Sequence, residues 1–181
     1  MAQEKRKKKF FDVEIPLVSQ ETQLQAYEIG ELDGRIINYD LTRTLKGKSM
    51  LLQLQVKMED GKPMTKAIQI KLLPYFLRRM VRKGTNYVED SFTTETKDGK
   101  ITVKPFMVTR RKVSRAIRKA LREKAREDLS NYFKNKNSEE IFDETIRGTI
   151  QKQLNTSLKK IYPLSLCEIR VLKVEKKNTH S

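Results

Sequence analysis

Apolar and polar residues alternate with a period of two over much of the first 110 positions. The clearest stretch runs from Met50 to Met58, where every even position is apolar, as in a strand with one buried face. A similar stretch over 64–70 follows Asp60-Gly61, a dipeptide that favours a tight turn. The pattern therefore predicts a β-hairpin.

Further strands are predicted on both sides of this hairpin. Earlier strands are expected over 10–17, 24–29 and 35–41. A second hairpin is expected from 86–96 and 100–108, around Lys97-Asp98-Gly99. Pro74 suits the first turn of a short helix, which Gly84 can end.

The C-terminal third changes to a helical period. Helices are predicted over 111–133 and 138–160, with Ser138 as the cap of the second, and a last strand is expected through Cys167, Ile169 and Val171. We therefore predict an α+β fold, in which helices pack on an antiparallel, barrel-like sheet and two of them lie in the C-terminal third.

The chain is predicted to form one domain between two polar ends. Its 181 residues suit a single core, which we place at 10–175. Residues 1–9 are basic and lack apolar periodicity, so we expect a disordered arm, and residues 176–181 are expected to form a polar tail.

The net charge of +16 points to a large anionic partner. The sequence has no apolar run long enough to cross a bilayer and no signal-peptide pattern, so nucleic acid is favoured over a membrane. One cysteine cannot form an intramolecular disulfide, which is in keeping with a reducing cytoplasm. We expect a cytoplasmic protein that does not form homo-oligomers.

The densest positive charge lies between Arg110 and Arg126, where the only acid is Glu123. At 100° per residue, the arginines share one side of the predicted helix and apolar residues such as Leu121 lie opposite. A solvated helix face usually mixes the two signs of charge, so this face is predicted to bind phosphate. The candidate residues are Arg110, Arg111, Lys112, Arg115, Arg118, Lys119, Arg122 and Arg126.

Three other basic segments are weaker RNA-binding candidates. One lies at the end of the middle helix, where cations also suit the helix dipole. The others are a loop and the N-terminal arm, and the composition of the arm also fits a localisation signal. They comprise Arg78, Arg79, Arg82 and Lys83; Arg43, Lys46 and Lys48; and Lys5, Arg6, Lys7, Lys8 and Lys9.

Catalytic chemistry has no evident place in the sequence. The only histidine, His180, lies next to the last residue, and Cys167 lies in an apolar strand. Nucleotide-binding loops and zinc spacings are missing, so we predict no enzyme activity, cofactor or metal. The acids Glu89, Asp90, Glu95 and Asp98 are scattered between the faces of a hairpin. The six tyrosines are interpreted as core or boundary residues, because most fall on apolar faces.

The order of these segments resembles a known family. The lysine run leading into Phe10-Phe11-Asp12-Val13, the segment Leu32-Asp33-Gly34-Arg35-Ile36, the stretch 95–99 before the Arg-rich helix, and Ile161-Tyr162-Pro163-Leu164 carry the resemblance. They are similar to the archaeal and eukaryotic small-subunit ribosomal protein e-S-one family, formerly called S-three-Ae. Asn38, Asp40 and Thr44 depart from the family's pattern, and the short C-terminal tail looks more like an archaeal form.

The resemblance implies a structural constituent of the small ribosomal subunit, on the platform near the mRNA exit. The implied partners are small-subunit rRNA and neighbouring ribosomal proteins, with mRNA as a further candidate. Two alternatives stay open on the sequence alone. One is a free-standing RNA or DNA chaperone or regulator, and the other is a magnesium-dependent nucleic-acid-processing enzyme.

Overall fold

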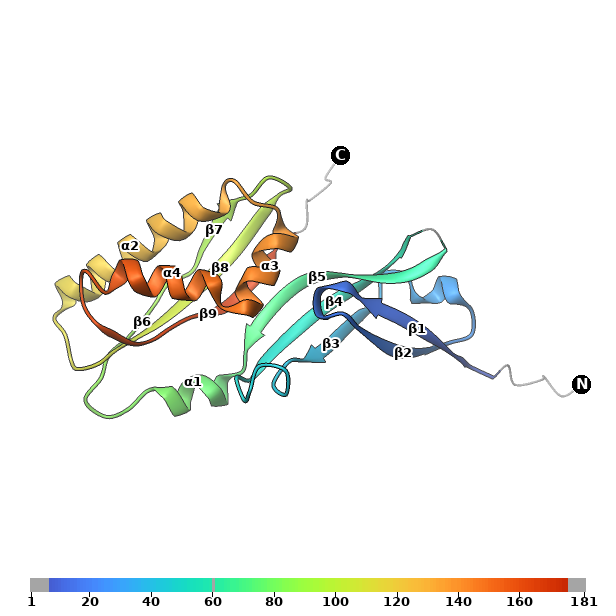
Figure 1. Cartoon of the computed structure of the whole chain (residues 1–181), viewed down its shortest axis with the longest axis horizontal. Helices are drawn as coiled ribbons and strands as arrows, with labels where there is room; N and C mark the ends of the chain where they lie inside the picture. Colours follow the sequence, from blue (N-terminus) through green and yellow to red (C-terminus); the bar gives the residue numbers. More distant parts are fainter. Residues whose placement is uncertain (1–6, 60, 176–181) are drawn as a thin grey trace, which may run out of the picture. The chain divides into compact units, whose positions relative to one another are not determined.

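Nine strands and four α-helices are found in the computed structural model, which describes residues 7–59 and 61–175 (Figure 1). The chain divides into two compact units, one comprising residues up to 39 together with 52–68, and the other comprising 40–51 and 69 onward. We call them unit 1 and unit 2. Strands β4 (Met50–Glu59) and β5 (Lys62–Leu72) contribute residues to both. The single domain over 10–175 stays a prediction.

Unit 1 is a row of strands that curls around a small apolar core. β1 (Lys9–Ile15) and β2 (Gln20–Ala26) pair antiparallel along their whole length, and β1 meets β5 in a parallel pairing at Glu14 and Met64. β5 then pairs with β4, and β4 pairs with β3 (Ile36–Asp40). The row therefore ends at β2 on one side and at β3 on the other.

Side chains join the two ends of this row. The Arg35 guanidinium donates to the carbonyl of Gln25 at 2.8 Å, and the Tyr39 hydroxyl donates to Gln20. Val13, Ala26, Leu32 and Val56 are buried inside the curl, and they come from β1, β2, the short 3-10 helix Ile29–Leu32 and β4. Among the described residues, no backbone pairing between β2 and β3 closes this row into the barrel-like sheet that was predicted, and the two ends are linked by the side-chain hydrogen bonds of Arg35 and Tyr39.

Unit 2 is a sheet covered on one face by three helices (Figure 1). β8 (Lys100–Thr109) is central, pairing antiparallel with β6 (Tyr87–Glu89), β7 (Phe92–Glu95) and β9 (Leu164–Val174). β9 also pairs with the end of β5 at Gln69–Lys71. Helices α2 (Arg115–Phe133), α3 (Ser138–Arg147) and α4 (Thr149–Leu158) pack on the sheet, whereas α1 (Pro74–Met80) does not belong to this layer.

Alternating strand residues and one stripe of each helix form the core of unit 2. The buried strand residues include Ile101, Val103 and Met107, and the buried helix residues include Phe133 and Phe142. The α+β class is confirmed, with a mostly antiparallel sheet and helices in the C-terminal third.

Several predicted element boundaries are wrong. The helix predicted over 138–160 is broken at Gly148, whose φ of +77° both ends α3 and begins α4. The strand predicted over 86–96 is interrupted at Asp90 and Ser91. The strand predicted over 24–29 is β2, which begins earlier, at Gln20, and the middle helix ends at Met80, before Gly84. Local turn chemistry decides these boundaries, and apolar periodicity does not reveal it.

The cap of α3 also differs from the prediction. Asn137 is the N-cap and forms a capping box with Glu140, whose carboxylate accepts from the Asn137 backbone N–H at 3.4 Å. Ser138 is buried instead, and its backbone N–H donates to Asp98 at 3.0 Å. Burial raises the pKa of Asp98, but hydrogen bonds from Ser138 and Thr96 outweigh it and leave the pKa below its usual value. Asp98 thus ties the turn between β7 and β8 to the start of α3.

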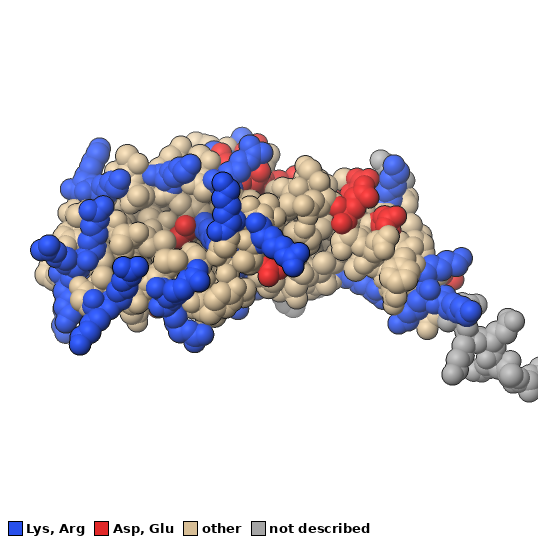
Figure 2. Space-filling view, turned by 60° about the horizontal axis from the view of Figure 1, so that its bottom comes forward, with Lys and Arg blue, Asp and Glu red and all other residues tan. Residues whose placement is uncertain are grey.

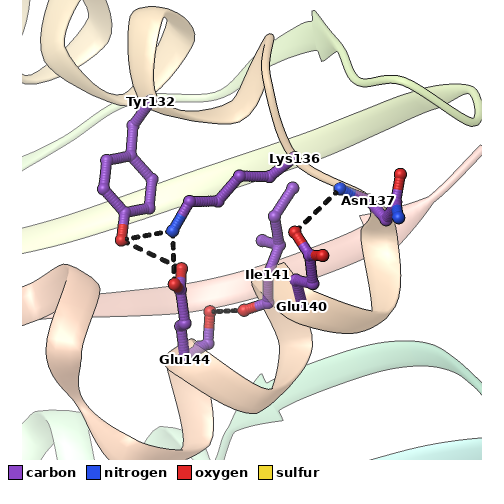
Figure 3. A network of polar contacts seen from close by, with 7 residues as sticks. Tyr132, Lys136, Asn137, Glu140, Ile141 and Glu144 are labelled. Carbon is purple, nitrogen blue, oxygen red and sulfur yellow. Dashed lines mark hydrogen bonds and ion pairs between the residues drawn. The ribbon is translucent and has the colours of Figure 1, made fainter.

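A polar cluster fixes the end of α2 against α3 (Figure 3). The Tyr132 hydroxyl donates to Glu144 at 2.9 Å, and the Lys136 ammonium contacts both Tyr132, at 2.8 Å, and Glu144. The same ammonium lies 4.1 Å from the centre of the Tyr132 ring. Because these groups are only partly exposed, the cluster orients α3 more firmly than a fully solvated ion pair would.

Arg126 docks the middle of α2 on the edge of the sheet. Its guanidinium makes two hydrogen bonds of 3.0 Å to the carboxylate of Asp90, and it lies 5.6 Å from the centre of the Phe92 ring. The side chain of Asp90 is only 11% exposed. This bidentate pair stabilises the contact between α2 and the residues that connect β6 and β7.

We predict that Gly148→Ala lowers the free energy of unfolding by about 1 kcal/mol, because a Cβ disfavours the left-handed conformation required there. Gly99→Ala is the matched control, since a Cβ at Gly99 meets nothing within 4 Å and its φ is not left-handed. Urea denaturation measures both. Equal effects of the two substitutions would contradict the account of the break between α3 and α4.

We also predict that Arg126→Ala lowers the free energy of unfolding by about 1 kcal/mol, a value already reduced for solvent screening at this half-exposed side chain. Arg115→Ala should stay within about 0.5 kcal/mol of the parent chain, because no ion pair is found for Arg115 in the described residues. Denaturant midpoints compare the two variants. A larger loss of unfolding free energy from Arg115→Ala than from Arg126→Ala would contradict the structural role assigned to Arg126.

Candidate nucleic-acid interface

The basic segment predicted as one helix consists of an extended connection followed by α2. Ser114 is the N-cap, and its hydroxyl accepts from the Ile117 backbone N–H at 3.4 Å. Arg110, Arg111 and Lys112 therefore precede the helix and do not lie on its face, which corrects the predicted start at 111. Within the helix, five of the six Lys and Arg residues lie between Arg115 and Lys124, and Arg126 follows in the second half.

The charge on α2 runs against its dipole. The chain has no acidic residue between Asp98 and Glu123, whereas Glu127 and Asp128 lie in the second half of the helix. The first turn of α2 contains no acid and the last turn no base. Cations at a helix N-terminus are unfavourable by a few tenths of a kcal/mol or more each. An anion bound at this end would offset that cost.

Asn86 holds the connection before α2 against the loop that follows α1. Its side-chain oxygen accepts from the Val113 backbone N–H at 2.9 Å, and its backbone N–H donates to the Thr109 hydroxyl at 3.0 Å. The Thr109 backbone N–H donates back to the Asn86 carbonyl at 2.9 Å. The Thr109 hydroxyl also reaches the Arg111 carbonyl at 2.7 Å. Asn86 is thus fixed against residues 109–113, and the turn that carries Arg82 and Lys83 directly precedes it, with Thr85 donating to the Arg82 carbonyl.

This arrangement gathers cations from two segments that are far apart in the sequence. We call the group the basic rim. Its members are Arg82, Lys83, Arg110, Arg111, Lys112 and Arg115. All six are exposed, and within residues 7–59 and 61–175 none of them forms an ion pair. Figure 2 shows Lys and Arg side chains crowding the end of unit 2 that carries α1 and the beginning of α2.

Three other candidate cations are engaged within the protein. Arg126 is held by Asp90 and Phe92, as described above. Lys48 lies 2.7 Å from Glu168 with both side chains largely buried, and Lys119 lies 3.7 Å from Glu123 on the exposed face of α2. Lys48 and Arg126 therefore have structural roles that their sequence context did not reveal.

The remaining candidates are dispersed. Arg78, Arg79 and Arg122 are exposed, and Arg79 lies 5.9 Å from the centre of the Phe76 ring. Arg118 is half-buried, with its Nε enclosed and without a hydrogen-bond partner in the described structure. The loop residues Arg43 and Lys46 are also exposed.

The predicted arm is described only in part. Lys7, Lys8 and Lys9 are exposed, and the Lys8 ammonium lies 5.6 Å from the centre of the Tyr27 ring. Lys9 already belongs to β1. Lys5 and Arg6 lie outside the described residues, as does the tail 176–181.

The interpretation of all tyrosines as core or boundary residues is wrong for three of them. Tyr27, Tyr75 and Tyr87 are 41%, 50% and 53% exposed. Tyr87 stacks on Phe106, with ring centres 5.9 Å apart and planes 18° apart. It follows Asn86 directly, so an exposed aromatic ring lies beside the basic rim. Strand alternation could have indicated it, because Val88, the next residue, takes the buried face.

Cys167 and three of the four acids considered in the sequence are engaged within the protein, whereas His180 lies outside the described residues. Burial, followed by the charge of Glu168, raises the pKa of the Cys167 thiol to about 12, so the nucleophilic thiolate is suppressed near neutral pH. Glu89, Asp90 and Asp98 are each bonded to a different partner, namely Arg170, Arg126 and Ser138.

Neither a metal cluster nor a membrane-spanning helix is present in the described residues. They contain no group of three or more His, Cys, Asp or Glu residues placed to hold a metal ion. Their helices are also too short or too polar to cross a membrane.

Comparison with known proteins gives consistent matches. Residues 2–178 match the Ribosomal S3Ae family. A Small ribosomal subunit protein eS1 from Methanothermobacter thermautotrophicus is 30% identical over 72% of this chain and 68% of its own length. Proteins of the same name from Pyrobaculum neutrophilum and Saccharolobus islandicus are 29% and 27% identical, over 75% and 93% of this chain and 62% and 85% of their own lengths.

The matched range spans nearly the whole chain, including both units and the segments that form the basic rim. The chain therefore belongs to the ribosomal S3Ae family.

Proposed function

We propose that this protein binds and positions rRNA in the small ribosomal subunit and that the basic rim is its principal contact surface. The family consists of structural ribosomal proteins, so the chain is a translation component of a cytoplasmic particle and not an enzyme. The finer assignment, which surface meets rRNA, rests on the geometry of unit 2.

The observation that carries the proposal is the convergence of two cation-rich segments at Asn86. Six exposed cations without an ion pair in the described part of the chain would repel one another unless an anion lies between them. A duplex RNA backbone provides such anions at regular intervals, and most contacts to it read shape rather than sequence. Guanidinium groups also suit phosphate, because they can donate two parallel hydrogen bonds.

The proposal also includes the location of the protein within the small subunit. The resemblance to the e-S-one family supports a place on the platform near the mRNA exit, with neighbouring ribosomal proteins and mRNA as further partners. In such a position the basic arm, whose residues 7–9 are exposed, would reach additional phosphates.

The proposal predicts a specific change in salt dependence. The triple variant Arg82→Glu, Arg111→Glu and Arg115→Glu should bind deproteinised small-subunit rRNA more weakly than the parent protein. The slope of log affinity against the logarithm of the KCl concentration should also be smaller in magnitude, by about 0.7–0.9 for each phosphate that the variant no longer neutralises. Filter binding over a series of KCl concentrations measures both quantities.

The matched control is Lys152→Glu, Lys159→Glu and Lys160→Glu on and beside α4, which changes the net charge equally at exposed positions. The control should keep the parent slope. If both triple variants lose affinity and slope alike, net charge alone determines binding, and the basic rim is not the contact surface.

A further inference from the structure

A pocket of about 470 Å³ lies in unit 2, on the face of the sheet opposite the helical layer. Its wall on the sheet consists of Tyr87 and Glu89 of β6, Phe106 of β8 and Arg170 of β9. Pro74, Leu77, Arg78 and Val81, from α1 and the residue after it, complete the lining. Val88, between Tyr87 and Glu89, is buried on the opposite face, where α2 packs on β6.

Tyr87 has the properties of a stacking platform. Phe106, which is 5% exposed, supports the ring from within the protein and fixes its orientation, while more than half of the Tyr87 surface remains open. A tyrosine that served only to fill the core would not leave half of its surface exposed to solvent. Stacking of bases on exposed aromatic rings is a common mode of binding to unpaired RNA.

The polar groups of the pocket suit the edge of a base. Arg170 and Glu89 form an ion pair of 2.5 Å at the pocket, and their side chains remain 38% and 44% exposed. One hydrogen bond uses only part of the capacity of each group, because a guanidinium has five N–H donors and a carboxylate accepts several hydrogen bonds. Together they present donors beside acceptors, which complements the mixed donor and acceptor edge of a nucleobase.

The position of the pocket points to the same ligand. Asn86 precedes Tyr87 directly and is the residue that organises the basic rim, while Arg82 and Lys83 follow Val81, which lines the pocket. A phosphate backbone on the rim would therefore bring its unpaired bases close to Tyr87. The pocket is of the size usual for small ligands, which leaves room for one base.

We infer that this pocket receives a single unpaired base of the RNA bound by the basic rim, stacked on Tyr87 and hydrogen-bonded by Glu89 and Arg170. This inference rests on the proposed function. The basic rim recognises the phosphate backbone, and the pocket recognises a base. The rim supplies affinity that depends on salt, and the pocket supplies a preference for RNA with a bulged or looped base.

The test uses the full chain and an RNA duplex with one bulged 2-aminopurine, together with the same duplex carrying an abasic bulge. The parent protein should quench the fluorescence of the bulged base. It should also bind the abasic duplex at least about fivefold more weakly, the lower end of the effect of one base–aromatic stack.

Three variants separate stacking from folding. Tyr87→Leu, which keeps apolar cover on Phe106, should lose both the quenching and the discrimination while retaining the salt dependence. Tyr87→Phe should keep both. Tyr75→Ala is the matched control, because Tyr75 is as exposed as Tyr87 but does not line the pocket, and it should behave as the parent does.

The outcomes distinguish the two proposals. Equal affinity for the base-containing and abasic duplexes, or parent-like quenching by Tyr87→Leu, would overturn the pocket inference and leave the rim intact. A parent protein that binds neither duplex at moderate salt would overturn the proposed function itself.

Discussion

The hydrogen bonds made by Asn86 determine how the positive charge of unit 2 is displayed. The side chain and backbone of Asn86 join the loop after α1 to the connection before α2, through hydrogen bonds with Thr109 and Val113. Thr109 is fully buried, so these bonds are shielded from competing water. They link the segment that carries Arg82 and Lys83 to the segment that carries Arg110, Arg111 and Lys112.

This arrangement imposes an electrostatic cost that the isolated protein cannot offset. The first turn of α2 carries Arg115 and Arg118 at the positive end of the helix dipole and contains no acid, whereas Glu127 and Asp128 lie in the second half. Arg126 and Lys48 are instead paired within the protein, with Asp90 and Glu168. The exposed cations of the rim have no ion pair in the described residues, so they remain available to a polyanion.

The sequence predicted which strands and helices form better than it predicted where they begin and end or how the strands pair. Alternation around Met50 to Met58 located β4, and the apolar side that includes Leu121 located α2, because both signals depend on burial along one face. The break at Gly148 and the capping box at Asn137 depend on local backbone chemistry instead. The same periodicity could not show that β5 would pair in parallel with β1 while its other end meets β9.

The candidate site was predictable in part. Charge density alone identified the segment from Arg110 to Arg126, but not that Arg126 is bound by Asp90, since the two are distant in the sequence. Nor could it show that Asn86 is bonded to Thr109 and Val113, or that Tyr87 is left exposed and stacked on Phe106. Pairing between strands and hydrogen bonds across long sequence separations decide these features, and a single sequence does not contain their geometry.

The central claim is that this chain is held in the small ribosomal subunit by rRNA at the basic rim. The most direct measurement is sedimentation of the tagged parent protein and the Arg82→Glu, Arg111→Glu, Arg115→Glu variant through sucrose gradients, at moderate and then at high salt. The account predicts that the parent protein migrates with small subunits through the high-salt wash and that the variant is released. A parent protein that stays at the top of the gradient, as a free-standing RNA-binding protein would, or a variant that remains bound as firmly as the parent, would contradict it.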